Sequence, residues 1–121
     1  MKMFPTLFVL ALSAAHASAT PSSESCSLRM SENGNFVTLQ GVVDPQIWPR
    51  GTYDMTMEVQ QGGNKSLSRQ AGAFGEGTPS EDGLLVLSST TVYVSDGGRL
   101  TVTLDIKDGN RNASCSLDYE R

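Results

Sequence analysis

The feature that most constrains the fold is an alternation of apolar and polar residues in several short segments. Residues 52–60 carry apolar side chains at every second position, namely Tyr53, Met55, Met57 and Val59. Residues 100–107 repeat the pattern with Leu100, Val102, Leu104 and Ile106. Because successive side chains of an extended chain point to opposite faces, a period of two predicts strands that are buried on one face only.

Weaker forms of the same pattern predict further strands in residues 26–30, 36–43, 84–95 and 113–120. Glycine-containing turn signals separate the segments, at residues 33–34, 62–63, 82–83, 97–98 and 108–109. Gly41 inside one segment indicates a bulge or a close backbone approach. No stretch has useful helical periodicity. We therefore predict an all-β chain, an immunoglobulin-like β-sandwich of about seven antiparallel strands.

The first residues read as an export signal. Lys2 is followed by the apolar run 7–12 and by the small residues Ala17-Ser18-Ala19. This predicts a signal peptide over residues 1–19, too short in its apolar part to span a bilayer, and one domain over residues 20–121. The alternative is a buried N-terminal helix.

Two cysteines, Cys26 and Cys115, lie on the first and the last predicted strand. In an exported protein such a pair most simply forms a disulfide. The alternative is a redox-active thiol pair, which usually has its cysteines one or two residues apart beside a positive group. The wide spacing therefore favours a structural disulfide between the two ends of the domain.

The chain lacks the residues of common catalytic sites. Its one histidine, His16, lies in the predicted signal peptide, so no imidazole base and no usual zinc site remain. Glu81 and Asp82 are half of a calcium site at most, and a solvated turn is the favoured interpretation. We expect no enzyme, and no catalytic, cofactor-binding or metal-binding residue.

Charge narrows the classes of partner. The whole chain has a net charge of −4, and loss of Lys2 with the signal peptide would make it −5. Nucleic acids and anionic membrane surfaces require clustered Lys and Arg, so neither is expected as a partner, and no membrane insertion is expected. The remaining class of function is non-covalent binding through the faces, loops or edges of a sheet.

Several of these segments together resemble the CsgH family, small periplasmic curli assembly proteins that are related to CsgC. The matching stretches are "SCSLRM", "VTLQGVV", "GTYDMTMEVQQGG", "SLSRQAGAF", "LTVTLDIKDG" and "SCSLDY". The most specific piece is residues 68–74, a Ser-x-Gln-x-Gly-x-Phe arrangement. The resemblance implies a periplasmic, non-enzymatic inhibitor that keeps curli subunits from assembling into amyloid before secretion. The Cys-x-Cys pair of some CsgC proteins is absent, so a thiol-redox role is not implied.

The resemblance also indicates where a client would bind. Curli repeats contain spaced Ser, Gln, Gly and Asn, and an unpaired strand edge can hydrogen-bond to such a chain. The predicted client-binding residues are Ser68, Arg69, Gln70 and Gly72, on or beside an edge strand that Phe74 anchors to the core. The alternative is that Arg69 and Gln70 are solvated strand positions leading into a Gly-rich loop. A second candidate surface is the outward face of the 52–60 strand, with Thr56 and Glu58.

Other interpretations remain open at the level of sequence. Trp48 either caps the open end of the sandwich or is an exposed recognition side chain.

The expected partner is a curli amyloid subunit, with the curli secretion machinery as a further candidate, and the protein is expected to be a monomer. The alternative function is a small secreted peptidase inhibitor on an immunoglobulin-like scaffold, and a third is a pilus or surface subunit that would need a donated strand.

Overall fold

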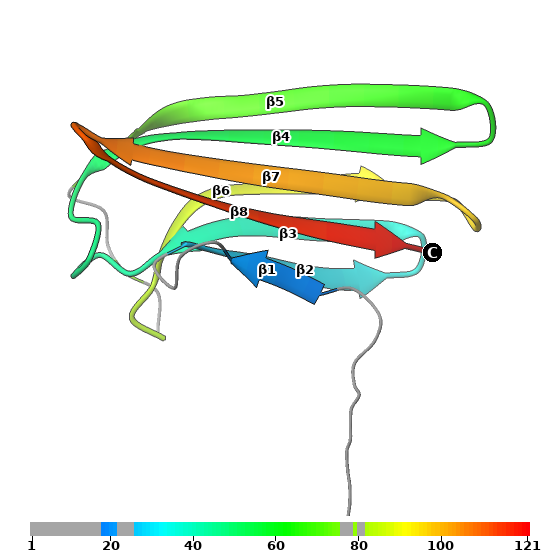
Figure 1. The fold of residues 1–121 in the computed structure, drawn as a ribbon. Coiled ribbons are helices and arrows are strands. Elements are labelled where there is room, and N and C mark those ends of the chain that lie inside the picture. The colour runs from blue at the N-terminus through cyan, green and yellow to red at the C-terminus, as the bar shows by residue number, and fades with distance from the viewer. Residues whose placement is uncertain (1–17, 22–25, 76–78, 80–81) are drawn as a thin grey trace, which may run out of the picture.

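Two antiparallel sheets pack face to face in the computed structural model, which describes residues 18–21, 26–75, 79 and 82–121 (Figure 1). The larger sheet has the order β1 (Ser18–Pro21), β8 (Arg111–Glu120), β7 (Arg99–Asp108), β4 (Gly51–Gln61) and β5 (Asn64–Phe74). The smaller has the order β2 (Cys26–Asn33), β3 (Phe36–Val43) and β6 (Leu85–Tyr93). The prediction of an all-β sandwich of about seven antiparallel strands is confirmed. No helix in the described ranges is long and apolar enough to cross a membrane.

The core lies between the two sheets and is built from the alternating residues. The inward side chains of β4 and β7 are almost fully buried, and those of β3 meet them from the opposite sheet; the core includes Val37, Leu39, Met55, Met57, Leu100, Val102, Leu104 and Ile106. The polar residues between them face outward. One-sided burial of this kind is the physical reason why the period of two appears in the sequence.

The short strand β1 precedes the seven predicted strands and was not expected from the sequence. It pairs antiparallel with β8, with Ser18 opposite Asp118 and Pro21 opposite Cys115. The predicted cleavage position, between Ala19 and Thr20, falls inside this strand. Residues 1–17 of the predicted signal peptide lie outside the described residues, so the signal peptide stays a prediction.

Gly41 shows both features that its place in a strand suggested. The register between β3 and β6 shifts between Gly41 and Val42, which is a bulge. A Cβ at Gly41 would lie 3.0 Å from Cδ2 of Leu104 on the facing sheet. The side chain of Leu104 therefore occupies the space that any larger residue at position 41 would need.

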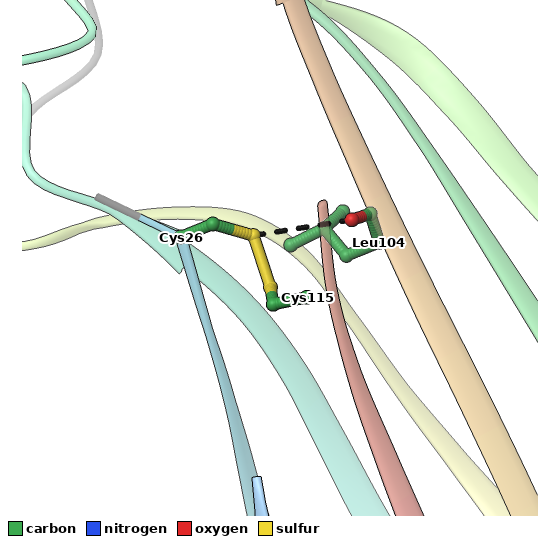
Figure 2. The surroundings of a disulfide bond; sticks show 3 residues. All are labelled: Cys26, Leu104 and Cys115. Atoms are coloured by element: carbon green, nitrogen blue, oxygen red, sulfur yellow. Dashed lines mark hydrogen bonds between the residues drawn. A yellow bond between two sulfur atoms is a disulfide. The ribbon is translucent and has the colours of Figure 1, made fainter. Parts of the chain in front are cut away.

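The predicted disulfide is present and joins the two sheets (Figure 2). Cys26 begins β2 and Cys115 lies in the middle of β8, with their Cα atoms 6.0 Å apart and a sequence separation of 89. Both side chains are buried, and Sγ of Cys26 lies 3.9 Å from the carbonyl oxygen of Leu104. This is a packing contact, because a disulfide sulfur carries no proton to donate.

Trp48 caps one end of the sandwich, as the favoured interpretation predicted, and the alternative of an exposed recognition side chain is wrong. Its side chain is 2% exposed and belongs to the core cluster. The guanidinium of Arg111 lies over the indole, 4.3 Å from the ring centroid. Nη2 of Arg111 also donates a hydrogen bond to the carbonyl oxygen of Ile47 at 2.9 Å. The loop before β4 is thereby held to the β7–β8 hairpin.

Replacing Arg111 by alanine is expected to lower the free energy of unfolding by about 1 to 2 kcal/mol. The variant loses the cation–π contact with Trp48 and a charge-assisted hydrogen bond to Ile47. Urea denaturation followed by Trp48 fluorescence measures the change. The control is Arg50→Ala, another exposed arginine of the same region, which is expected to stay within about 0.5 kcal/mol of the parent protein. Equal midpoints for both variants would contradict the prediction.

Candidate functional site

The predicted client-binding segment is an edge strand. Within the described residues β5 pairs with β4 alone, from Gly51 opposite Phe74 to Gln61 opposite Asn64, and nothing lies beyond it in the sheet (Figure 1). The register runs without a shift over all these pairs. Ser68, Arg69, Gln70 and Gly72 all lie on this strand, so their predicted placement is confirmed. Their role in binding a client stays a prediction.

The four residues are divided between the two faces of β5. Directly opposed residues of an antiparallel pair share a face. Ser68 opposes Met57, Gln70 opposes Met55 and Gly72 opposes Tyr53, so these three belong to the inner face of the sheet. Arg69 opposes Thr56 and belongs to the outer face. This division follows from sequence parity, because Phe74, the predicted anchor, is an even number of positions away from Gln70 but an odd number from Arg69.

Apart from Gly72 and Phe74, the inner-face residues of β5 are polar and uncharged. Ser88 of β6 donates a hydrogen bond from its hydroxyl to Oε1 of Gln70, which connects the edges of the two sheets. Phe74 is partly buried and packs against the core, as predicted. Towards the β4–β5 turn, Ser66 and Ser68 are exposed although their side chains belong to the inner face, since the three-stranded sheet does not cover this part of β5.

Gly72 is needed for close packing at this edge. A Cβ at position 72 would lie 3.1 Å from both Cε1 and Oη of Tyr53. The Tyr53 ring therefore lies across the glycine, as aromatic residues often do beside a glycine in a neighbouring strand. The contact explains why the segment tolerates a glycine in a strand, where it is otherwise unfavourable.

The outer face brings Arg69 next to the second candidate surface. The guanidinium of Arg69 donates two hydrogen bonds to the Asp54 carboxylate, with Nε 2.8 Å from Oδ1. Nζ of Lys65 lies 3.8 Å from Oε2 of Glu58. Thr56 lies between these ion pairs and is exposed, whereas Glu58 is half-buried. Thr56 and Glu58 thus share one surface with Arg69, although the sequence predicted two separate surfaces.

The Arg69–Asp54 pair makes a testable electrostatic prediction. Hydrogen bonds from Arg69 hold the pKa of the Asp54 carboxyl below its ordinary value. The ion pair stabilises the fold fully at pH values above the ordinary aspartate pKa. This stabilisation is lost as the pH falls through the lowered pKa of Asp54 in the folded state. We expect Arg69→Ala to raise the pKa of Asp54, as measured by NMR titration of the carboxyl carbon. An unchanged titration midpoint would show that the ion pair is absent in solution.

No grouping of three or more His, Cys, Asp or Glu side chains able to hold a metal ion occurs within the described part of the chain. Glu81, half of the calcium site considered above, lies outside the described residues. The carboxylate of its neighbour Asp82 makes an ion pair with Arg29. The Asp82 carboxylate therefore takes part in a contact between its turn and β2.

Two solved structures share this architecture. One is the solution structure of R. palustris CsgH, which has 25% sequence identity and a TM-score of 0.57, and the match covers 78% of this chain and 90% of CsgH. The fold resembles that of CsgH. The other is the E. coli curli protein CsgC, with 11% identity and a TM-score of 0.58 over 77% of this chain and 97% of CsgC.

The CsgH resemblance recognised in the sequence is confirmed by these structures, whereas the likeness to CsgC at 11% identity shows the fold alone. No protein-family model and no curated protein matches the sequence. The comparison therefore rests on the CsgH-like fold.

Proposed function

We propose that this chain is a periplasmic, non-enzymatic inhibitor of amyloid assembly, acting on a curli subunit by transient non-covalent contact. The observation that carries the proposal is the match of its fold to 90% of the CsgH chain. CsgC, which shares the fold, is a curli protein. The open edge of β5 supplies a surface suited to an extended polypeptide.

A folded sandwich with an open edge has a physical route to inhibition. Amyloid subunits become strands that add to one another through unpaired backbone groups. An edge strand of a stable domain offers the same groups to such a subunit. The covalent link between β2 and β8 keeps the inhibitor itself in its own fold, so the contact delays assembly without drawing the inhibitor into the fibre.

A fibrillation assay tests the proposal. Purified protein is added at a few per cent of the molar concentration of a curli subunit, and assembly is followed by amyloid-dye fluorescence. We expect a lag several times longer than that of the subunit alone. A cystine-linked immunoglobulin domain of similar net charge is the control. An unchanged lag at equimolar inhibitor would reject the proposal, and inhibition of a peptidase by the same sample would favour the alternative function instead.

A double substitution tests the residues. Arg69→Ala with Gln70→Ala removes one side chain from each face of β5, together with the Asp54 and Ser88 contacts. If these side chains meet the client, the lag in the assay shortens towards that of the subunit alone. Lys107→Ala with Asn112→Ala, at exposed positions on other strands of the same sheet, is the control. An unchanged lag for the Arg69 and Gln70 variant would remove the side-chain hypothesis.

Export is tested separately. Cell fractionation with mass spectrometry of the isolated protein is expected to find it in the periplasm, with Thr20 as its first residue. A protein that retains Lys2 would overturn the predicted signal peptide.

A further inference from the structure

We propose that the client binds by strand addition at β5. The binding groups are the backbone N–H and C=O groups of Lys65, Leu67, Arg69, Ala71 and Ala73. The identity of the client rests on the proposed function. An extended segment adds to the five-stranded sheet as a sixth strand, and the main chain of alternate β5 residues holds it.

The hairpin between β4 and β5 determines which residues are free. Gly62 and Gly63 form a two-residue loop, with a φ of 58° at Gly62, between the paired residues Gln61 and Asn64. In such a turn the flanking residues hydrogen-bond to each other, and along the ladder every second residue of the strand does the same. The even-numbered residues 64–74 therefore bond to β4. The N–H and C=O groups of residues 65, 67, 69, 71 and 73 point away from the sheet.

The hairpin between β7 and β8 independently predicts the same alternation of bonded and free residues in β5. Asp108 and Arg111 flank a two-residue loop that begins at Gly109, with a φ of 63°. The odd-numbered residues of β7 then bond to β4, where Lys107 opposes Thr52 and Thr103 opposes Thr56. The even-numbered residues of β4 are used in that ladder, which leaves its odd-numbered residues for the even-numbered residues of β5.

The usual protections of an edge strand are weak along β5. Residues 64–74 contain no proline, and their register with β4 has no bulge. The two cations on the strand, Lys65 and Arg69, form ion pairs with Glu58 and Asp54 on β4. Their charges are directed towards the sheet, where they deter an incoming strand less than free charges at an edge would.

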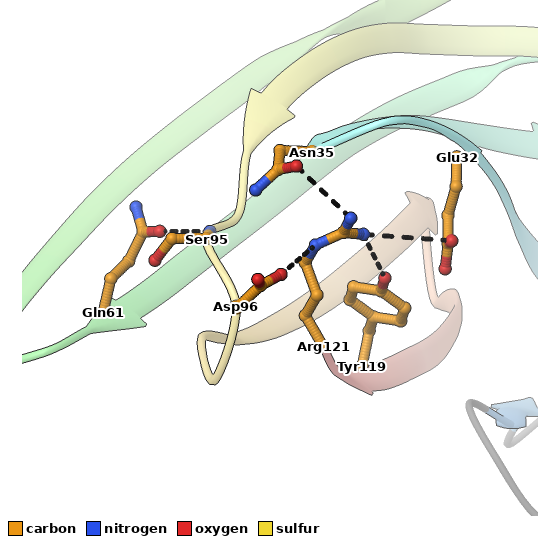
Figure 3. A network of polar contacts seen from close by, with 7 residues as sticks. All are labelled: Glu32, Asn35, Gln61, Ser95, Asp96, Tyr119 and Arg121. Carbon is orange, nitrogen blue, oxygen red and sulfur yellow. Dashed lines mark hydrogen bonds and ion pairs between the residues drawn. The ribbon is translucent and has the colours of Figure 1, made fainter.

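Of the edge strands in the described structure β5 is the longest, with 11 residues against 9 in β6 and 8 in β2. β1 pairs with β8 only from Cys115 to Asp118, and the predicted cleavage would leave Thr20 and Pro21 of β1. The disulfide holds the first residue of β2 to β8. At the end of β6 the amide of Gln61 donates a hydrogen bond to the carbonyl of Tyr93 at 3.3 Å. It also accepts one from the N–H of Ser95 at 2.6 Å, as Figure 3 shows. Ser88, further along β6, contacts Gln70. Within the described residues β5 therefore offers the longest unpaired strand edge.

The chemistry beside the edge indicates the partner. An added strand would place every second side chain on the inner face, next to Ser66, Ser68 and Gln70. These neighbours offer hydroxyl and amide groups, which can hydrogen-bond to polar uncharged side chains of the added strand. The occupant is therefore an extended segment with Ser, Thr, Asn, Gln or Gly at alternate positions, as a curli repeat provides.

Hydrogen exchange by NMR tests this mode without any substitution. In the free protein, the amides of Lys65, Leu67, Arg69, Ala71 and Ala73 are expected to exchange faster than those of Ser66, Ser68, Gln70 and Gly72. Addition of a curli subunit should slow the first set about tenfold and leave the second set unchanged. Absence of the alternation, or slowing only on another strand, would overturn the proposal.

A proline variant tests it in the fibrillation assay. Ala71→Pro removes one free N–H and places a ring at the open edge, while the ladder to β4 stays intact. The inhibitor concentration needed to double the lag should rise about tenfold, the effect of a lost hydrogen bond at the upper end of its usual range. Ala71→Ser, which keeps the N–H, is the matched control.

Three outcomes are distinguishable. If the parent protein fails to delay fibrillation, the proposed function fails. If the parent and both variants delay it equally, strand addition at β5 is wrong although the function stands. Thermal unfolding shows whether Ala71→Pro is folded; if it is not, the exchange experiment on the parent protein decides.

Discussion

Replacing both Cys26 and Cys115 by alanine is expected to lower the free energy of unfolding by roughly 4 to 5 kcal/mol. The disulfide closes a loop with a sequence separation of 89, and in the chain-entropy account the stabilisation grows with the logarithm of loop length. A domain of this size is stabilised by about 5 to 15 kcal/mol in total. Urea denaturation monitored by circular dichroism should show a much lower midpoint, or a largely unfolded variant at 37 °C.

The control for this prediction is Ser27→Ala with Ser116→Ala, two exposed positions next to the cysteines in sequence. That variant should unfold within about 0.5 kcal/mol of the parent protein. Because both cysteine side chains are buried, the parent protein is also expected to resist thiol reductant until it unfolds. Rapid alkylation of both cysteines in native buffer containing reductant would contradict that expectation.

Leu104→Ala is expected to lower the free energy of unfolding by about 3 to 4 kcal/mol. The side chain is fully buried between the two sheets, so its loss removes apolar burial and leaves a cavity. The matched control is Leu67→Ala on β5, where the leucine is 65% exposed and little burial is lost. Similar unfolding midpoints for the two variants would show that Leu104 is not a core residue.

A substitution at Gly41 tests the same packing, because Leu104 occupies the space beside this glycine. Alone, Gly41→Ala should cost about 1 to 2 kcal/mol, since the new methyl group displaces the Leu104 side chain. Combined with Leu104→Ala, the same methyl group enters the cavity, so the double variant should be less destabilised than the sum of the single variants by about 1 kcal/mol. Simple additivity would mean that the two positions do not touch.

The binding site was predictable only in part. The sequence motif placed Ser68, Gln70 and Gly72 on or near an edge strand, and parity relative to Phe74 was a usable signal for assigning them to one face. The ion pair between Arg69 and Asp54 joins residues of two strands and depends on their register. The Gln61 contact with Tyr93 and Ser95 joins different sheets, and no local pattern indicates it.

The free backbone groups of β5 were also predictable only in part. Which residues of the strand carry them follows from the two-residue loop at Gly62 and Gly63, which is a local feature. That they are free at all depends on β4 having β7 on its other side, with β5 left outermost. A pairing between β4 and β7 closes a long loop, so its choice rests on the packing of the whole core.

The sequence alone determines one-sided strands and the glycine turns between them, since alternation and backbone conformation are local properties. It also predicts the link between Cys26 and Cys115, because two cysteines allow one intramolecular disulfide. The order of the strands, and with it the open edge at β5, was decided by tertiary structure. The reason is that pairing partners far apart in sequence are selected by how two sheets bury a shared core. The sequence of one strand does not specify which strands lie beside it.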